Sequence, residues 1–143
     1  MHVAAVLKRK GTKIITIAPD QSITKAAHLL TSNHIGAVPV VDPHDGLVGI
    51  ISERDIVRGI TEHGSSVLNL AVETLMTRDV LTCTPQETMG TIMDLMTTRR
   101  IRHLPVIERG ALCGIISIGD AVKNRLDENE LEMETLRGYL GGT

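Results

Sequence analysis

The chain has 143 residues, of which 42% are apolar and 1% aromatic, with no Phe or Trp and a formal net charge of −2. That length suits one domain, or two small halves that share a core. The near-absence of aromatic rings argues against a protein that stacks on nucleobases, and the balanced charge argues against one that binds nucleic acid mainly through phosphates.

The sequence also constrains compartment and metal chemistry. No window approaches eighteen uninterrupted apolar residues, and the N-terminal charges follow a very short apolar run, which is the reverse of a secretory signal. Cys83 and Cys113 lie thirty residues apart, without a C-x-x-C motif or a His at metal-ligand spacing. We therefore expect a cytoplasmic protein without a membrane span or metal site, and with two reduced, buried cysteines.

The first predicted elements are a short helical connector, a strand and an amphipathic helix. The connector is VAAVL at 3–7, and the strand lies near Thr16. After Pro19, Ser22 is a suitable helix cap. The apolar residues that follow recur at i, i+3, i+4 and i+7 and form one core-facing stripe: Ile23, Ala26, Ala27 and Leu30.

A hairpin and a second helix complete the unit. Short strands are predicted at 36–41 and 47–52, with a Gly-bearing turn between them. The next helix is predicted over Glu53–His63, ending at Gly64. We expect this helix to turn three apolar side chains inward: Ile56, Val57 and Ile60.

The remaining chain repeats the unit. The pairs at an offset of 66 include Thr16 with Thr82, Pro19 with Pro85, Ile35 with Ile101, and Pro39-Val40 with Pro105-Val106. At an offset of 65, the segment GIIS at 49–52 recurs at 114–117, and Asp55 aligns with Asp120. The single-residue change falls where a turn can absorb it. The second helical stripe is Met89, Ile92, Met93 and Met96, and its spacing favours core packing over a soft-metal site.

The repeat predicts an α/β (α+β) fold. Each unit is predicted to contain a strand, a helix, two strands and a helix, in that order. A unit of about 60 residues is only marginally stable by itself, so we expect the two units to bury their sheets against each other. The predicted division is 1–64 for the first unit with its connector, 65–125 for the second, and 126–143 for an acidic helical tail. The product is one compact pseudo-symmetric module with two equivalent clefts.

The motif S-x-x-D, found at Ser52–Asp55 and Ser117–Asp120, has two interpretations. In the first it is a capping pair, in which the acid bonds back to the cap N–H at the helix start. In the second the same geometry binds a ligand, because free N–H groups attract an anion and a carboxylate accepts two hydrogen bonds from a ribose diol. The two interpretations are compatible.

These motifs together, in the same order twice, make residues 3–125 resemble a tandem pair of CBS domains, often called a Bateman module. The resemblance implies that each cleft can hold an adenosine compound, with AMP as first choice and then ATP, NAD(H) or S-adenosylmethionine. It assigns the ribose to Asp55 and Asp120, with Ser52 and Ser117 beside them. The residues implied near the base are Thr16, Ile17, Ala37, Val38, Pro39, Thr82, Cys83, His103, Leu104 and Pro105.

The two clefts need not be equal. The segment RRIRHLPV at 99–106 places four basic residues, Arg99, Arg100, Arg102 and His103, where the first unit has NHIGAVPV. In similar modules, basic residues just ahead of L-P-V reach the phosphates of a nucleotide whose ribose lies on the Asp of the other half. The resemblance therefore implies that Asp55, with Arg102 and His103 across the cleft and Arg54 or Arg58 nearby, forms the site for the more anionic ligand. The Asp120 site would suit a bulkier or less charged ligand. The alternative for the arginines is a solvated helix end.

No catalytic motif is present: the sequence has no G-x-S-x-G, H-E-x-x-H, phosphate loop or G-x-G-x-x-G. We expect a non-enzymatic regulatory module without a catalytic cofactor that signals through a homodimer to an unknown regulated protein. The alternative is an interaction scaffold without a nucleotide ligand. A nucleic-acid binder is disfavoured. The tail stripe of Leu126, Met133, Leu136 and Leu140 is expected to pack on this domain or on a partner subunit.

Overall fold

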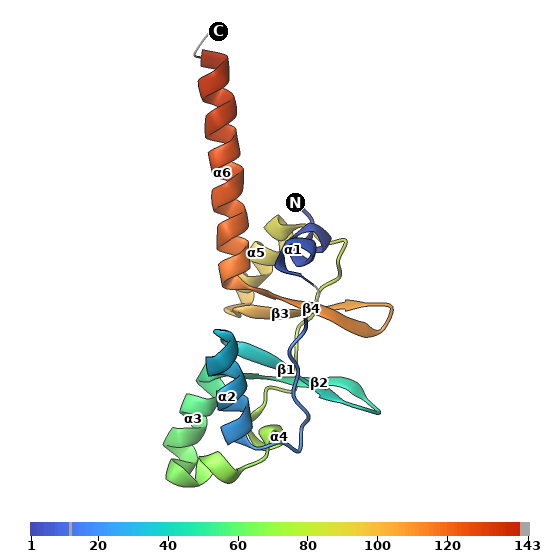
Figure 1. The fold of residues 1–143 in the computed structure, drawn as a ribbon, viewed down its shortest axis with the longest axis vertical. Helices are drawn as coiled ribbons and strands as arrows, with labels where there is room; N and C mark the ends of the chain where they lie inside the picture. Colours follow the sequence, from blue (N-terminus) through green and yellow to red (C-terminus); the bar gives the residue numbers. More distant parts are fainter. Residues whose placement is uncertain (12, 141–143) are drawn as a thin grey trace.

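Two antiparallel hairpins form the centre of the computed structural model, which describes residues 1–11 and 13–140. Strand β1 (Ala37–Asp42) pairs with β2 (Gly46–Ser52), and β3 (His103–Glu108) pairs with β4 (Ala111–Ser117). The hairpins contact each other through β2 and β4, and Figure 1 shows them stacked with helices on both outer sides. This arrangement confirms the predicted α+β module packed through its sheets.

The strand expected before the first helix of each unit is reduced to a single residue. The Ile17 N–H donates to the Pro39 carbonyl at 3.1 Å, and the Val41 N–H donates to the Ile17 carbonyl at 2.9 Å. The equivalent residue of the second unit, Cys83, makes the same two bonds. Each hairpin therefore carries one parallel bridge at its edge instead of a full third strand.

The turns of the two hairpins differ by one residue, as the change of offset predicts. Three residues separate β1 from β2, whereas only Arg109 and Gly110 separate β3 from β4. These two residues have φ values of 52° and 76°, and two consecutive positive φ angles are the requirement of a type I′ hairpin turn. The register irregularity also falls at the same place in both hairpins.

The amphipathic helices form as the periodicity predicts. Helices α2 (Ile23–Asn33) and α5 (Met89–Arg99) begin at caps in which Ser22 and Thr88 accept a backbone N–H. Their stripes lie in two separate cores. The stripe residues buried there are Ile23, Ala26, Leu30, Met89, Ile92 and Met96. Met89 and Met96 are thus buried in the core at helical spacing, which is the role that the sequence favoured for this stripe.

Helix α3 (Glu53–His63) has the predicted bounds, but the predicted orientation is wrong for two residues. Val57 and Ile60 are 63% and 51% exposed, while Asp55 and Gly59 are buried. A Cβ at Gly59 would lie only 2.5 Å from Leu75 Cδ1. The glycine therefore lets α3 approach its neighbours closely, and this close packing turns the Asp55–Gly59 side inward.

The connectors cross between units. Helix α1 (Val3–Lys10) packs on the second unit, where the Val3 N–H donates to the Glu87 carbonyl at 2.9 Å. The 3₁₀ helix η1 (Gly64–Asn69) and α4 (Val72–Leu75) pack on the first unit. The N-terminal connector, which the predicted division assigns to the first unit at 1–64, therefore packs on the second unit. In Figure 1, α1 lies beside α5 and α6, while α4 lies beside α2.

The last element, α6 (Ile118–Leu140), is one continuous helix that starts in the second unit and extends away from the body (Figure 1). The predicted unit limit at 125 therefore falls inside a helix, and residues 141–143 of the predicted tail lie outside the described residues. Among the helices of 1–11 and 13–140, none combines the length and apolar character needed to cross a bilayer.

Candidate functional site

A cavity of about 600 Å³ lies where the two units meet. Its walls come from the start of β1 and the start of α3 in the first unit, and from the start of β3 and the start of α6 in the second. The crossing connector α1 adds Leu7 and Lys10. The volume lies within the range of about 300–1,000 Å³ that is typical of small-molecule sites.

The cavity brings together part of the predicted site. The predicted residues that line it are Ala37, Ser52, Arg54, Asp55, Arg102, His103 and Ser117. The predicted residues outside its lining are Thr16, Ile17, Val38, Pro39, Arg58, Thr82, Cys83, Leu104, Pro105 and Asp120. Neighbouring residues of a strand point to opposite sides. His103 therefore faces the cavity while Leu104 is buried in the second core.

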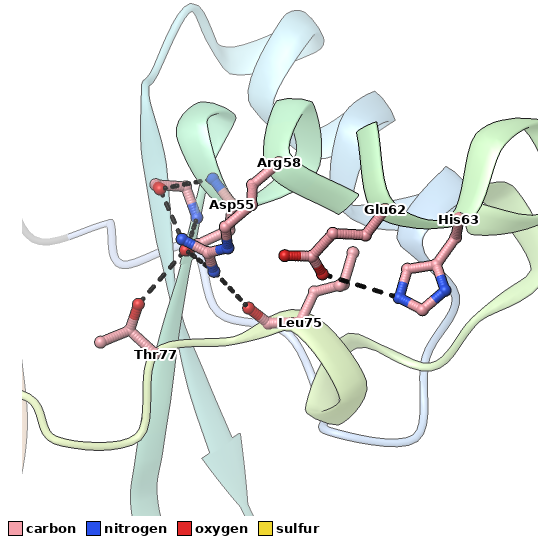
Figure 2. Close-up of polar contacts among 7 residues, drawn as sticks. Asp55, Arg58, Glu62, His63, Leu75 and Thr77 are labelled. Carbon is pink, nitrogen blue, oxygen red and sulfur yellow. Dashed lines mark hydrogen bonds and ion pairs between the residues drawn. The ribbon is translucent and has the colours of Figure 1, made fainter. Parts of the chain in front are cut away.

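The Asp55 carboxylate is held by the chain itself (Figure 2). Its Oδ2 accepts the Ser52 N–H at 2.9 Å and the Ser52 hydroxyl at 3.0 Å. Its Oδ1 accepts Arg58 Nη2 at 2.9 Å and the Thr77 hydroxyl at 3.3 Å. A carboxylate has about four acceptor positions, and here each has a donor from the chain. The capping interpretation of the first S-x-x-D motif is therefore confirmed.

The Asp120 carboxylate has different partners. Its Oδ2 accepts the Ser117 N–H at 2.8 Å, as in the first motif, but it also accepts Lys10 Nζ at 2.7 Å. The same ammonium donates to the Ile115 carbonyl at 2.8 Å. Asp120 lines a smaller pocket of about 140 Å³ and not the main cavity. The two aspartates are thus related in sequence but lie in different surroundings.

The main cavity carries more positive than negative charge. Its cationic side chains are Lys10, Lys13, Arg54, Arg100 and Arg102, and its carboxylates are Glu53 and Asp55. Sequence reasoning missed Lys10 and Lys13. The basic run at 8–10 was visible, but its place over the cavity depends on α1 crossing to the second unit. An anionic ligand is therefore the kind that this lining attracts.

Two helix ends also contribute residues: His34, which sequence reasoning assigned to the surface, and Arg100, which it considered within the basic segment at 99–103. His34 and Arg100 are equivalent in the repeat, both line the cavity, and both hold a left-handed conformation, with φ of 53° and 55°. This conformation is uncommon for residues other than glycine. The match of His34 with Arg100, one residue before the equivalent Ile35 and Ile101, is the signal that could have placed His34 in the site.

The His103 ring lies against Gly36. A Cβ built on Gly36 would be 3.2 Å from ring atoms Cε1 and Nε2, so the glycine leaves the room that the imidazole uses. Burial lowers the pKa of His103 from 6.5, with Lys10 and Arg102 acting in the same direction and Glu53 opposing them. The ring is therefore neutral at pH 7 and contributes hydrogen-bonding capacity without charge.

Comparison with known proteins identifies the family to which the chain is similar. A family model of the CBS domain matches residues 5–62 and 72–127. The CBS domain-containing protein CBSX3, mitochondrial, from Arabidopsis thaliana is 34% identical over 148 residues, covering 98% of this chain and 72% of that protein.

Two solved structures have the same fold. The CBS-domain containing protein ATU1752 from Agrobacterium tumefaciens has a TM-score of 0.84 and 43% identity, covering 87% of this chain and 99% of that one. The CBS domain pair of protein MJ0100, in complex with 5′-methylthioadenosine and S-adenosyl-L-methionine, has a TM-score of 0.77 and 28% identity, covering 91% and 98%. The duplicated sequence, the paired hairpins and these matches agree, and the chain belongs to the CBS domain family, with two copies of the domain in tandem.

Proposed function

We propose that this CBS pair is a non-catalytic regulatory module that binds an adenosine nucleotide in the cavity between its units. The observation that carries the proposal is the cavity of about 600 Å³ with its excess of cationic side chains. The MJ0100 pair, which has the same fold, was solved with two adenosine compounds. AMP is the first choice, followed by ATP, NAD(H) and S-adenosylmethionine, because phosphates match the charge of the lining.

In this proposal the phosphates lie near Arg102 and the start of α3, where Arg54 and the positive end of the helix dipole favour an anion. The adenine lies among the apolar part of the lining, which consists of Leu7, Ile14, Ile15, Ile35, Ile50, Ile101, Ile115 and Ile118. The ribose reaches Asp55 by replacing the Arg58 and Thr77 donors on Oδ1. The predicted contacts outside the cavity lining stay predictions for the ligand-bound protein.

Regulation requires that the ligand prefer one conformation of the module or its dimer. A ligand with equal affinity for both conformations would shift nothing, however tightly it bound. A cavity with walls from both units supplies such a preference when closure of the units changes the distance between the phosphate-binding and ribose-binding sides. The regulated protein reads that change.

One observation favours the second candidate, an interaction scaffold without a nucleotide. All four acceptor positions of Asp55 are used within the chain, and Lys10 pairs with Asp120. Under that function both motifs are caps only, and a ribose would gain no bond that the chain does not already make.

A thermal-shift titration separates the two functions. Saturating AMP at about 100 times its Kd should add about 2.7 kcal/mol of stability, which corresponds to a rise of about 8 °C in Tm for a chain of this size. At the same concentration, adenosine should bind more weakly because it lacks the phosphate, and it should therefore raise the Tm less. Arg102→Gln should reduce the AMP shift, whereas Arg99→Gln, outside the cavity lining, should leave it unchanged. If none of the adenosine compounds moves the Tm, the scaffold function holds.

A further inference from the structure

The distal part of α6 exposes an apolar stripe that the module does not cover. Every residue from 129 to 140 is exposed, and Figure 1 shows this part of the helix extending away from both units. The stripe repeats every seven residues. Its first position holds Leu126, Met133 and Leu140, and its second holds Val122, Asn129 and Leu136. The five apolar members are 46–73% exposed. This is the heptad spacing of a coiled-coil seam.

The opposite face of α6 is the one that packs on its own module. Ala121 and Asn124 are buried against the second unit. Farther along that face, Asp127 pairs with Arg9 at 3.0 Å, and Glu128 pairs with the N-terminal ammonium at 3.5 Å. These contacts orient the helix so that the seam points away from α1. The seam is therefore open to a second helix without any rearrangement of the module.

The charges beside the seam favour a parallel partner. In a parallel pair, each residue just before a first position faces the residue five places later on the other helix. Arg125 of one copy then faces Glu130 of the other, and Glu132 faces Arg137. By symmetry, each of these attractive pairs occurs twice.

An antiparallel pair that buried the whole seam would bring like charges together. Glu130 would face its own equivalent, Glu132 would do the same, and Lys123 would face Arg137. The polar seam residue Asn129 would lie opposite Met133 with no partner for its amide. In a parallel pair Asn129 faces Asn129, so the two side-chain amides can hydrogen-bond to each other within the seam.

We propose that two copies of the chain pair through α6 as a parallel, two-stranded coiled coil over residues 122–140. The occupant of the exposed seam is thus the same helix of a second copy, as its charge pattern is self-complementary only in that arrangement. Leu131 lies on the far side of the helix from the seam and stays exposed. The interface is independent of the nucleotide, so its test does not depend on the proposed function.

Site-directed cross-linking tests the orientation. In a Cys113→Ser background, which leaves only the buried Cys83, Leu136→Cys should give a covalent dimer under mild oxidation because equivalent seam residues face each other. Leu131→Cys, on the same helix and 64% exposed in the natural chain, is the matched control and should stay largely monomeric on a non-reducing gel. Equal cross-linking of the two variants would overturn the proposal. So would a mixture in which Leu126→Cys cross-links to Leu136→Cys while neither cross-links to itself, because that is the antiparallel result.

Charge reversal tests the flanking pairs. Arg125→Glu with Arg137→Glu should raise the dimer dissociation constant in sedimentation equilibrium at least tenfold, or about 1.4 kcal/mol. Mixing this variant with Glu130→Arg/Glu132→Arg chains should restore the dimer as a heterodimer. An unchanged dissociation constant, a failure of the mixture to pair, or a wild-type chain that sediments as a monomer would each show the proposal to be wrong.

Discussion

Replacing Asp55 by alanine should be the most costly single change in the site, and the structure allows the cost to be worked out. The lost bond to the Ser52 N–H removes a capping interaction of about 1 kcal/mol. The two hydroxyl groups that donate to a carboxylate only 4% exposed add about 1–2 kcal/mol together. Arg58, with a side chain 55% exposed, adds no more than about 0.5 kcal/mol because water screens the pair. The sum is about 3 kcal/mol.

Asp120→Ala is the matched control, because it removes the same cap from the second unit. Its backbone bond to Ser117 is worth about 1 kcal/mol. The ion pair with Lys10 is 2.7 Å long but has side chains 36% and 19% exposed, so it adds about 0.5–1 kcal/mol. The expected loss is therefore about 1.5–2 kcal/mol, smaller than the loss at Asp55 by about 1 kcal/mol.

Urea unfolding of the two variants without ligand measures this difference. For a chain of this length, 3 kcal/mol corresponds to a fall of about 10 °C in Tm, which calorimetry resolves easily. Equal losses, or a larger loss for Asp120→Ala, would refute the reasoning, because the additional donors at Asp55 would then contribute nothing. Repeating the melts in the presence of AMP shows whether Asp55 acts only as a helix cap or also contacts the ligand. A ribose contact also removes the ligand-dependent gain in Asp55→Ala, whereas a pure cap leaves that gain intact.

Three further substitutions probe the packing beneath the connectors and the charge of the cavity. Gly49→Ala should cost about 2–3 kcal/mol in urea melts because the new methyl would lie 2.9 Å from the backbone carbonyl oxygen of Thr77. Gly114→Ala should cost about 1 kcal/mol less, since only the flexible end of Leu7 has to move, and equal costs would contradict this reasoning. His103→Gln should reduce the loss of stability on acidification: the folded-state pKa of His103 is lowered, so the unfolded chain takes up the proton first and stability falls as the pH drops below about 6.5. The free energy of unfolding of the natural protein and of His103→Gln, measured side by side over about pH 7.5–5.5, checks this. Identical slopes against pH would exclude a role for the ring.

Local patterns were sufficient to predict most of the fold. The bounds of α3, the caps at Ser22 and Thr88, and the one-residue difference between the turns all depend on short-range spacing. The exposure of Val57 and Ile60 could not be predicted in this way. An apolar residue at helical spacing is expected to face the core, and only the close approach of α3 at Gly59 shows which side is buried.

The site was predicted less completely, because its walls come from segments far apart in the chain. The residues beside each S-x-x-D motif could be identified from the repeat. The position of Lys10 could not, since it depends on which unit α1 packs against. The separation of Asp120 from the main cavity has the same cause. A connector that crosses to the other unit is a long-range feature without a local signature.

The crossing connectors explain why the duplicated motif keeps its glycine, serine and aspartate. Gly49 and Gly114 lie beneath the connector side chains of Met76 and Leu7, each within 2.6 Å of where a Cβ would stand. Serine and aspartate make the same reciprocal cap in both units. These three residues therefore hold the strand, the helix and the connector together, which every copy of the unit needs.

The difference between the halves arises outside the motif. The connector over the first unit brings the neutral hydroxyl of Thr77 to Asp55, while the connector over the second brings the ammonium of Lys10 to Asp120. A hydroxyl at 3.3 Å is more easily displaced by a ribose than an ammonium at 2.7 Å, because the ionic bond is shorter and stronger. The repeat thus preserves the framework of both motifs, while the connectors give the two aspartates different partners and place Asp55 at the main cavity and Asp120 at the smaller pocket.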